Sequence, residues 1–390
     1  MKITYISEKE YSNRDESSGT AYWIPTCLQR ADIELDIINV SIPQKLLPPW
    51  EELGMRYKQF VSRWSKKGYF TPELLVRRAQ YVAQVLEERV SQLNSDVIFT
   101  ALSPTCAAFL KAKQPIAFWS DYVYSACAGF YPENRFHHID TRWDGHEVTD
   151  ACLMNSKLLI FSSHWAARSA IELHGISQNK IHVVPFGPNL EIDHSGQEIK
   201  SWVTRRQPKP IKLLFVGKTW FRKGGDIVLA VAKRLNELNH ETQVTLVGAK
   251  PDHGELPSYV KYIDFISKNS PEDLEVMKRL YQESHFLFVP SRAETFGIVF
   301  CEASAFGVPS LTTFVGGIGD VVKNGVNGMT FSLEASLDDI CNYILTTLND
   351  PLAYQELCLS SYNEYKTRLN WDVAGQCVKD IIASRFNISC

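Results

Sequence analysis

Residues 286–312 read FLFVPSRAETFGIVFCEASAFGVPSLT. The first four residues form a continuous apolar run, which is typical of a strand buried on both faces. A polar turn follows, then an apolar helical segment from about Gly297 to Phe306, and then a last strand at Pro309–Thr312. A strand, a helix and a strand in this order predict two parallel strands joined by a crossover helix, which is the unit of α/β folds.

The same alternation of apolar runs and helical segments extends along the chain. The longest helix is predicted near residues 72–93, where apolar residues recur at three- and four-residue steps. Alternating strands and helices favour parallel sheets covered by helices on both faces. The other strands are predicted at 2–7, 33–40, 96–100, 115–120, 157–162, 181–185, 211–216, 243–247 and 260–265, and the other helices at 224–238 and 271–283.

The segment between residues 186 and 210 separates two such α/β halves. It holds four residues that interrupt regular structure, Gly187, Pro188, Pro208 and Pro210, among polar residues, and this composition favours a linker. The sequence therefore predicts two α/β domains, one on either side of this segment.

The composition excludes several classes of protein. The chain has 390 residues, enough for two or three domains, and its 45% of hydrophobic residues excludes a mainly disordered state. Lys and Arg number 41 against 44 Asp and Glu, a formal net charge of −3, so the chain lacks the basic balance typical of nucleic-acid-binding proteins. We therefore expect no nucleic-acid partner.

The start of the chain and its cysteines indicate a cytoplasmic protein. The first residues lack the features of a signal peptide, and no stretch of 18 uncharged apolar residues predicts a membrane-spanning helix. The nine cysteines are scattered without a Cys-x-x-Cys pair, which is typical of free thiols in a reducing compartment. No metal site is expected, because the side chains of the adjacent His137 and His138 diverge and no cysteine lies at ligand spacing.

Two glutamates in the 286–312 stretch are candidate binding residues. Glu294 precedes the expected helix start and Glu302 lies two turns farther on, so both are expected to face one crevice. The amides at a helix start attract an anion, and a carboxylate accepts hydrogen bonds from a vicinal diol. One glutamate thus suits a ribose and the other a hexose, with a diphosphate between them. The alternative is an N-capping acid and a glutamate on the helix surface.

A loop that carries glycines and cations follows the predicted strand at 211–216. Lys218, Arg222 and Lys223 lie where an open α/β sheet binds its ligands, beyond the carboxyl ends of the strands. Cations at this place are suited to neutralise a leaving diphosphate. The alternative for Arg222 and Lys223 alone is a solvated turn. A second glycine-rich loop lies at residues 314–328.

Together these residues resemble the retaining glycosyltransferases of the GT-B architecture, the large family 4 or glycosyl transferases group 1. The family's E-x7-E signature matches Glu294 and Glu302, within the string P-S-x-x-E-x-F-G-x-x-x-x-E-A that Gly307-Val308-Pro309 follows. The resemblance covers roughly residues 211–371. Further matches are the cation pair Arg222-Lys223, the glycine pair Gly316-Gly317 ahead of Asp320, and Trp371 at the start of the final helix.

The resemblance implies an α/β fold of two Rossmann-like doubly wound domains that face each other across a cleft. The family's final helix returns to the first domain, so residues 1–188 plus 373–390 would bind the acceptor and residues 189–372 the nucleotide sugar. It also implies a hexosyltransferase (EC 2.4) that uses a nucleotide sugar as co-substrate, forms an α-linkage and needs no metal. Family frequency favours a UDP-sugar, and a GDP-sugar is the second candidate.

The family's site residues carry over to this chain position by position. Arg222 and Lys223 would hold the diphosphate, Glu302 the ribose hydroxyls and Glu294 the donor sugar, so that Glu294, Arg222 and Lys223 are the implied catalytic residues. The base would pack near Phe265 and Ile266, with Arg292 as a further candidate. The whole implied donor-binding set is Gly217, Lys218, Arg222, Lys223, Phe265, Ile266, Arg292, Glu294, Thr295, Phe296, Gly297, Ile298, Val299 and Glu302.

The first half departs from the family pattern at two places. The family's double glycine after the first strand aligns with Ser18-Gly19-Thr20, and its histidine–aspartate pair aligns with Ser120-Asp121, which lacks the histidine. The candidates on the acceptor side are therefore Gly19, Thr20 and Asp121. Asp121 either takes over part of the histidine's contact or only caps the next turn. His164 is interpreted as a helix-entry residue.

The chemistry expected of such a site is a front-face transfer, because no side chain is an obvious nucleophile. The leaving phosphate would then accept the proton of the acceptor, which is a sugar, a lipid-linked molecule or a small molecule with a hydroxyl group. Residues 56–78 interleave basic and aromatic side chains, which suits an anionic lipid or acceptor and a peripheral position at the inner membrane face. An ordinary exposed amphipathic helix is the alternative for this segment.

Two other functions fit the sequence less well. A nicotinamide dehydrogenase should carry Gly-x-Gly-x-x-Gly after a first strand, and no such motif follows the strands at 2–7 and 211–216. A catalytically silent protein of the same fold, which binds a sugar nucleotide, is consistent with the missing histidine. The intact Glu294, Glu302 and cation pair argue against that second reading.

Overall fold

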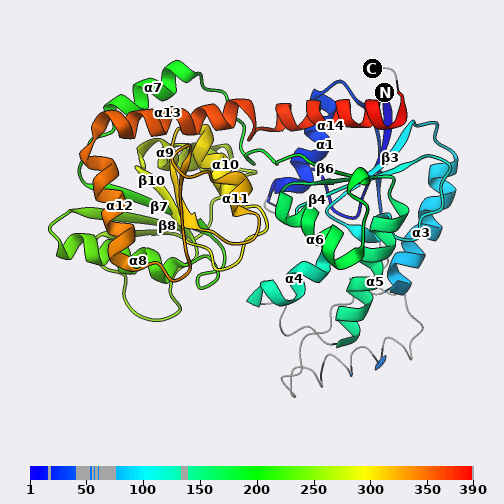
Figure 1. Ribbon diagram of the computed structural model, residues 1–390, viewed down its shortest axis with the longest axis horizontal. Coiled ribbons are helices and arrows are strands. Elements are labelled where there is room, and N and C mark those ends of the chain that lie inside the picture. The colour runs from blue at the N-terminus through cyan, green and yellow to red at the C-terminus, as the bar shows by residue number, and fades with distance from the viewer. Residues whose placement is uncertain are drawn as a thin grey trace. The chain divides into compact units, whose positions relative to one another are not determined.

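The structure is a computed structural model that describes residues 1–15, 19–40, 76–132 and 139–388, together with residues 53, 54, 57 and 60. The chain divides into two compact units (Figure 1). The first comprises Met1–Val184 and Gly375–Cys390, and the second comprises Pro185–Ala374. The domain bounds expected from the sequence lie a few residues from these divisions.

A parallel six-stranded sheet forms the centre of the first unit, in the order β2-β1-β3-β4-β5-β6. Strands β3, β4 and β5 are buried along their whole length, as a parallel sheet with both faces covered requires. Their carboxyl ends lie at one edge of the sheet, where α/β folds bind ligands. The strands are β1 (Lys2–Ser7), β2 (Glu34–Asn39), β3 (Val97–Ala101), β4 (Ile116–Ser120), β5 (Leu158–Phe161) and β6 (Ile181–Val183).

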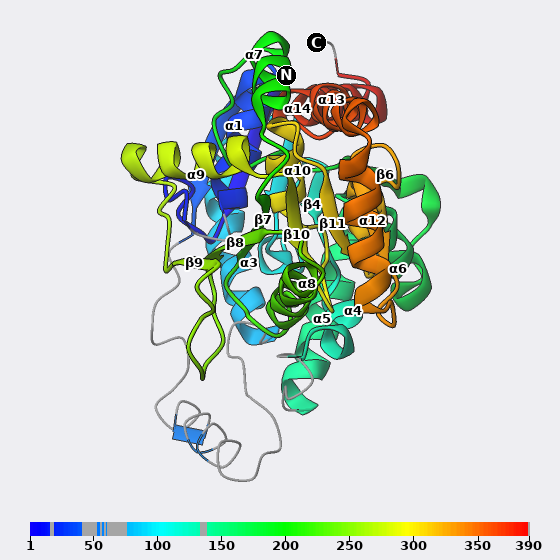
Figure 2. The same ribbon diagram turned by 90° about the vertical axis from the view of Figure 1, so that its left-hand side faces the viewer.

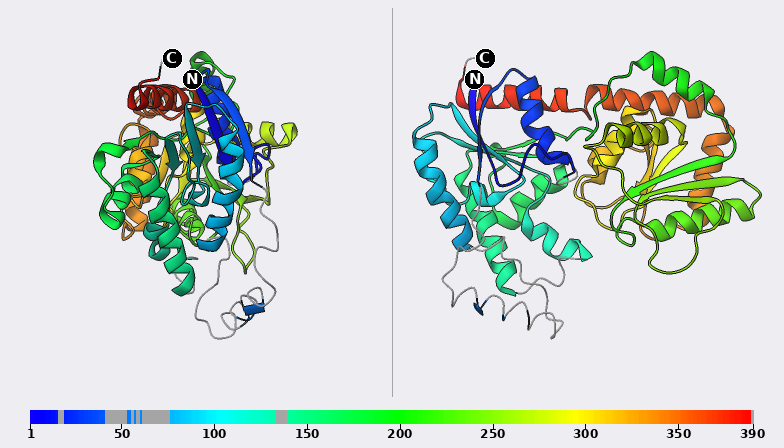
Figure 3. Two further views of the ribbon diagram at one scale, coloured as in Figure 1. Left: turned by 90° about the vertical axis from the view of Figure 1, so that its right-hand side faces the viewer. Right: turned by 180° about the vertical axis from the view of Figure 1, so that it is seen from behind.

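Helices cover this first sheet. The helix predicted near 72–93 is α3, which spans Val76–Ser91 and buries Ala79, Val82 and Leu86 on one face. The final helix, α14, begins at Trp371 and belongs to the first unit from Gly375 onward. It lies beside α1 (Figure 3, right), because Gly375 has no Cβ that would collide with the Cys27 carbonyl. The helices are α1 (Thr20–Arg30), α3 (Val76–Ser91), α4 (Tyr124–Phe130), α5 (Ile139–Asn155), α6 (His164–His174) and α14 (Trp371–Phe386), with short 3-10 turns η3 (Pro104–Cys106) and η5 (Gln178–Lys180).

The second unit has its own parallel six-stranded sheet, in the order β12-β11-β10-β7-β8-β9. Figure 2 shows β9, β8, β7, β10 and β11 side by side. Strands β7 and β10 are neighbours at its centre, so the loops that leave their carboxyl ends lie next to each other. The strands are β7 (Ile211–Gly217), β8 (Thr242–Gly248), β9 (Val260–Ile263), β10 (Phe286–Val289), β11 (Ser310–Thr313) and β12 (Gly328–Phe331).

Several helices of the second unit pack against one another, and α12 also contacts α13. Helix α8 contacts α12, and α13 contacts both α10 and α7. The helices are α7 (Gly196–Arg205), α8 (Gly225–Glu237), α9 (Pro271–Glu283), α10 (Ile298–Ala305), α11 (Ile318–Val321), α12 (Leu337–Asn349) and α13 (Pro351–Thr367).

Two expectations about the second unit are wrong. The strand at 309–312 is not the last one, because β12 pairs with β11 in parallel register, Thr312 opposite Thr330. Residues 186–210 are not a plain linker, because they contain helix α7, which buries Ile199. Its start carries a capping box, in which the side chains of Ser195 and Glu198 hydrogen-bond to each other's backbone N–H groups.

Candidate active site

The loops after β7 and β10 bring the predicted catalytic residues together. β7 ends at Gly217 and its loop reaches α8, while β10 ends at Val289 and its loop reaches α10. The ammonium group of Lys223 forms an ion pair with Oε2 of Glu294, and Nη1 of Arg222 lies 4.0 Å from the same oxygen. All three side chains are at most 17% exposed, so solvent screens this contact poorly. A carboxylate and two cations therefore meet at the carboxyl edge of the sheet.

Glu302 lies deeper, on α10, with no exposure to solvent. Its Oε1 accepts a hydrogen bond from the ammonium of Lys268 at 2.7 Å, and its Oε2 accepts one from the Tyr281 hydroxyl at 2.8 Å. Burial raises the pKa of Tyr281 far above its ordinary value, and the charge of Glu302 adds to this, so the phenol stays protonated and donates. The sequence interpretation missed Lys268 and Tyr281, because no motif relates them to Glu302.

The start of α10 has the geometry of an anion site. Gly297 precedes the helix with a φ of 88°, in the left-handed region, and a Cβ there would collide with the Phe300 ring. The amides of Ile298 and Val299 lie in the first turn, which has no preceding helical carbonyls to accept from them. The predicted residues Thr295 and Phe296, which precede this turn in the chain, are buried.

The residues expected at the base lie in the loop after β9. Phe265 is 50% exposed, whereas Ile266 is buried. The ammonium of Lys218, from the loop after β7, lies 5.3 Å from the centre of the Phe265 ring, a cation–π distance. An exposed aromatic ring next to a buried apolar side chain suits the stacking of a planar base.

Arg292 is engaged by protein groups. Its guanidinium donates to both carboxylate oxygens of Asp226, at 2.8 and 2.7 Å, and to the Phe221 carbonyl at 2.6 Å. Burial acts to raise the pKa of Asp226, but the hydrogen bonds and charge of Arg292 outweigh it and the pKa lies below its ordinary value. The sequence had placed Arg292 near the base, and Asp226 was missed.

The glycine-rich loop after β11 reaches the same place. The Gly317 amide donates to the Glu294 carbonyl at 3.2 Å, and the Asp320 amide donates to the Gly317 carbonyl. The Asp320 carbonyl accepts from Arg368 at 2.6 Å. In the sheet, β11 and β7 flank β10 on opposite sides. The loop after β11 therefore contacts the Glu294 backbone from one side, and the loop that carries Lys223 lies on the other side.

The acceptor-side candidates lie at the carboxyl edge of the first sheet. Gly19, with a φ of 94°, precedes α1, Thr20 begins that helix, and Asp121 follows β4 directly. His164 is the first residue of α6, as expected. The structure adds Glu8, which follows β1: its Oε2 accepts from Ser103 at 2.8 Å, and its Oε1 is buried with no hydrogen-bond partner within the described part of the chain. A charged residue directly after the first strand was the available signal for Glu8.

Comparison with known proteins supports the family resemblance. Residues 196–364, from α7 into α13, match the family profile described as "Glycosyl transferases group 1". Over this segment the chain is similar to the glycosyl transferases group 1. The resemblance deduced from the E-x7-E string is thereby confirmed.

Several known proteins share sequence or fold with this chain. D-inositol 3-phosphate glycosyltransferase from Xylanimonas cellulosilytica is 24% identical over 260 residues, which span 58% of this chain and 57% of that protein. The chain thus spans a little over half the length of this curated relative. Sucrose-phosphate synthase from Thermosynechococcus elongatus superposes with a TM-score of 0.72 at 16% identity and covers all of both chains. Anabaena HepE in complex with UDP-glucose superposes with a TM-score of 0.61 at 16% identity, over 98% of this chain and all of that one. The expected GT-B fold, with two Rossmann-like units, is confirmed by these likenesses and by the two parallel sheets.

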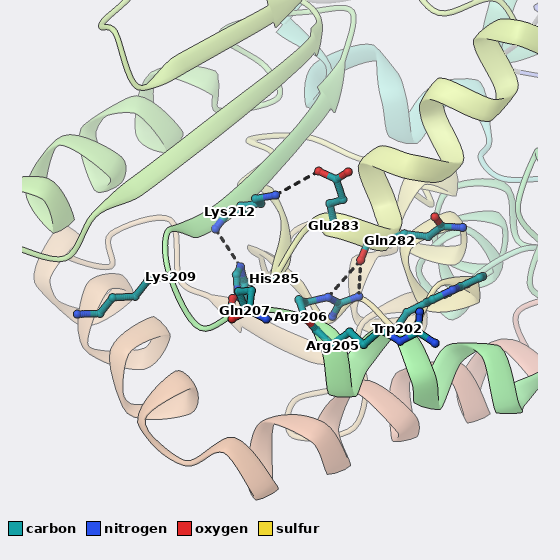
Figure 4. A pocket seen from close by; sticks show the side chains of 9 residues that line it. All are labelled: Trp202, Arg205, Arg206, Gln207, Lys209, Lys212, Gln282, Glu283 and His285. Atoms are coloured by element: carbon teal, nitrogen blue, oxygen red, sulfur yellow. Dashed lines mark hydrogen bonds and ion pairs between the residues drawn. The ribbon is translucent and has the colours of Figure 1, made fainter.

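The second unit also has a cavity of about 300 Å3 at the amino ends of β7 and β10 (Figure 4). Arg206 lines it and donates to the carbonyls of Gln282, at the end of α9, and Gly307, beyond α10. Lys212 pairs with Glu283 at 3.1 Å. Arg206 therefore hydrogen-bonds to backbone carbonyls near the carboxyl ends of α9 and α10, and Lys212 neutralises the Glu283 carboxylate. The seven-residue β7 places the cavity about 20 Å from the predicted donor residues at the other edge of the sheet.

The described residues can also be compared with the requirements of metal sites, membrane spans and disulfides. Within the described ranges, no group of three His, Cys, Asp or Glu side chains is placed to hold a metal ion. No helix among those same residues is long and apolar enough to cross a bilayer. The cysteines that the structure describes are free thiols, and all except Cys377 are buried. His137, His138 and most of the 56–78 segment lie outside the described residues.

Proposed function

We propose that this protein is a retaining glycosyltransferase that moves a hexose from a nucleotide sugar to a hydroxyl acceptor with an α-linkage. The observation that carries the proposal is the contact of Lys223 and Arg222 with Glu294 beside the start of α10. The match of residues 196–364 to the glycosyl transferases group 1 supports it, and so does the buried second glutamate of the signature, Glu302.

The donor would lie along the carboxyl edge of the second sheet. Arg222 and Lys223 would share the diphosphate with the amides from Phe296 to Val299, since an ammonium has three donors and Glu294 uses one. Glu294 would then bind hydroxyls of the hexose, while Glu302 binds the ribose. Gly217 and Lys218 would border the diphosphate, and Phe265 and Ile266 would pack on the base.

The cations would supply most of the catalysis. Negative charge builds on the leaving phosphate while the anomeric carbon becomes cationic, and preorganised donors stabilise that charge best where water is scarce. In a front-face step, the bond from the anomeric carbon to the leaving oxygen breaks as the acceptor oxygen bonds to that carbon on the same face. The leaving phosphate takes the acceptor proton. No divalent metal enters this proposal, because Arg222 and Lys223 carry the positive charge.

A UDP-sugar is the proposed donor, with a GDP-sugar as second candidate. The supporting observation is that Anabaena HepE, which shares the fold, has been solved with UDP-glucose. The acceptor would approach the first unit near Gly19, Thr20 and Asp121, at the carboxyl edge of the sheet where Glu8 follows β1. A sugar, a lipid-linked or a small-molecule acceptor fits this chemistry, and residues 56–78 are the proposed contact with an anionic membrane in a cytoplasmic protein.

Thermal-shift screening of UDP-, GDP- and ADP-sugars, followed by an assay of donor hydrolysis, tests the function. We expect one sugar nucleotide to raise Tm and to be hydrolysed slowly in EDTA, with the hydrolysis lost in Glu294→Ala. Binding without release of nucleoside diphosphate would identify a silent binding protein instead. A glycosyl-enzyme detected by mass spectrometry would overturn the front-face step. Vesicle flotation with anionic lipid tests the membrane contact, which salt-sensitive binding would support.

A further inference from the structure

Arg292 lies where the loop after β10 touches the loop after β7. Its backbone N–H donates to the Arg222 carbonyl at 2.7 Å, and its Nη1 donates to the Phe221 carbonyl at 2.6 Å. In the reverse direction, Nη1 of Arg222 donates to the Ala293 carbonyl at 3.1 Å. Lys223 follows Arg222 in one loop, and Glu294 follows Ala293 in the other. The contacts therefore join the two loops directly next to the ion pair between Lys223 and Glu294.

The Arg292 side chain completes the junction with a third partner. Its guanidinium forms a two-pronged ion pair with Asp226, in the first turn of α8, and lies 4.0 Å from the centre of the Phe221 ring. A bidentate pair fixes both distance and orientation, because the planar guanidinium has a rigid set of donors. The side chain of Arg292 is 26% exposed, so this pair is partly shielded from solvent.

Gly224 allows the two loops to come this close. It has a φ of 75°, and a Cβ at this position would collide with the Pro290 carbonyl oxygen. The backbone of one loop therefore lies directly against the other. The position of Arg222 and Lys223 relative to Glu294 depends on how these loops are held together.

We propose that Arg292 is a positioning residue, paired with Asp226, that sets Arg222 and Lys223 in register with Glu294. The effect of this arrangement on catalysis rests on the proposed function. The contacts assign the Arg292 guanidinium to the Asp226 carboxylate and to the ring and carbonyl of Phe221, in place of the nucleobase. A misplacement of cations by about 1 Å costs on the order of 100-fold in rate, so a small shift of this junction has a large effect.

A double-mutant cycle with Arg292→Ala and Asp226→Ala tests this inference. We expect each single variant to lower kcat for donor turnover about 10- to 100-fold and the double variant to be no slower than the worse single one. Affinity for uridine, which has no phosphate, should stay within about 2-fold, whereas affinity for UDP should fall, because only the cations are displaced. Arg292→Lys should recover part of kcat, since it keeps the charge without the bidentate geometry.

Arg234→Ala is the matched control, because Arg234 also pairs with an aspartate, Asp338, at 2.8 Å, near the other end of α8. It should leave kcat and both affinities unchanged. If Arg292→Ala weakens uridine binding while Asp226→Ala does not, Arg292 is a base contact and the inference is wrong. Additive losses in the double variant would equally overturn it.

Hydrogen exchange separates this inference from the proposed function. Arg292→Ala and Asp226→Ala should speed amide exchange in residues 218–224, without any nucleotide present, and Arg234→Ala should not. If both variants exchange faster but the protein binds no sugar nucleotide, the proposed function is refuted and the positioning role of Arg292 and Asp226 stands. Unchanged exchange in both variants would refute the junction.

Discussion

The ammonium of Lys268 lies 2.7 Å from Oε1 of Glu302, a carboxylate that is fully buried in the second unit. The two residues are brought together by the loop after β9 and helix α10. A buried charge that loses its partner is costly, because the low-dielectric interior does not solvate it. The pair therefore links the stability of the second unit to the predicted ribose site.

Lys268→Met should destabilise the protein by about 3 kcal/mol. It removes the positive charge next to the buried Glu302 carboxylate and keeps the hydrogen bond from the Tyr281 hydroxyl. Urea unfolding at pH 7 measures the change. Lys261→Met, which removes an exposed lysine on the adjacent β9, is the control and should have almost no effect. Equal unfolding midpoints for wild type and Lys268→Met would contradict the prediction.

Lys223→Met should weaken the binding of UDP about 10- to 100-fold, because a charge-assisted hydrogen bond to a phosphate contributes about 1.5–3 kcal/mol. Isothermal titration calorimetry with UDP and uridine measures this, and uridine binding should be unchanged. Lys233→Met on the outer part of α8, where the lysine is 71% exposed, serves as the control. A similar loss of affinity in both variants would show that the effect is not local.

Gly224→Ala should cost clearly more stability than Gly254→Ala. Both glycines have a positive φ, of 75° and 93°, so both substitutions carry a backbone cost of about 1–2 kcal/mol. A Cβ at Gly254 meets nothing within 4 Å, whereas one at Gly224 collides with the Pro290 carbonyl. Thermal unfolding of both variants isolates the steric part, and Gly224→Ala should also lose UDP affinity. Equal Tm values would mean that the loops can separate freely.

His285 should make the stability of the protein depend on pH between 6.5 and 4. The Lys212 backbone N–H donates to its Nδ1, so Nε2 carries the proton and donates to the Gln207 carbonyl at 2.8 Å. Burial, and next the charge of Arg206, lower its pKa from 6.5 to about 4. Between these values the unfolded chain binds a proton that the folded protein does not.

Stability from this group is therefore complete above pH 6.5 and is lost as the pH falls toward 4. The loss amounts to about 3 kcal/mol at most. His285→Gln lacks the titrating group, so the difference in unfolding free energy between wild type and variant should change over this interval. A constant difference from pH 7 to pH 4 would show that His285 titrates normally when folded.

Part of the candidate site could be predicted from the sequence. Lys223 and Glu294 are 71 residues apart, but each follows a strand of a parallel α/β unit, and such strands end at one edge of a sheet. Neighbouring strands then bring their loops into contact, as β7 and β10 do. The E-x7-E spacing likewise places Glu302 in α10, about one turn beyond the helix start that lies near Glu294.

Other partners could not be predicted. Asp226 and Lys268 are ordinary charged residues in the sequence, and their partners Arg292 and Glu302 lie 66 and 34 residues away. Strand β12 was missed because its sequence, Gly-Met-Thr-Phe, is too short for a clear apolar run, and its pairing with β11 alone defines it. Helix α7 did carry a readable signal, Ser195 three residues before Glu198, within a segment otherwise typical of a linker.

The sequence by itself determined the α/β class, the family resemblance and the residues that follow the strands, because apolar periodicity and motif spacing are local properties of the chain. Only the tertiary structure decided which charges neutralise one another, because an ion pair depends on where loops from different strands meet. In the sequence Arg292 was a candidate contact for a base. In the folded protein its guanidinium is held by Asp226 and the Phe221 carbonyl, because the loops after β7 and β10 leave adjacent strands and Gly224 lets their backbones touch.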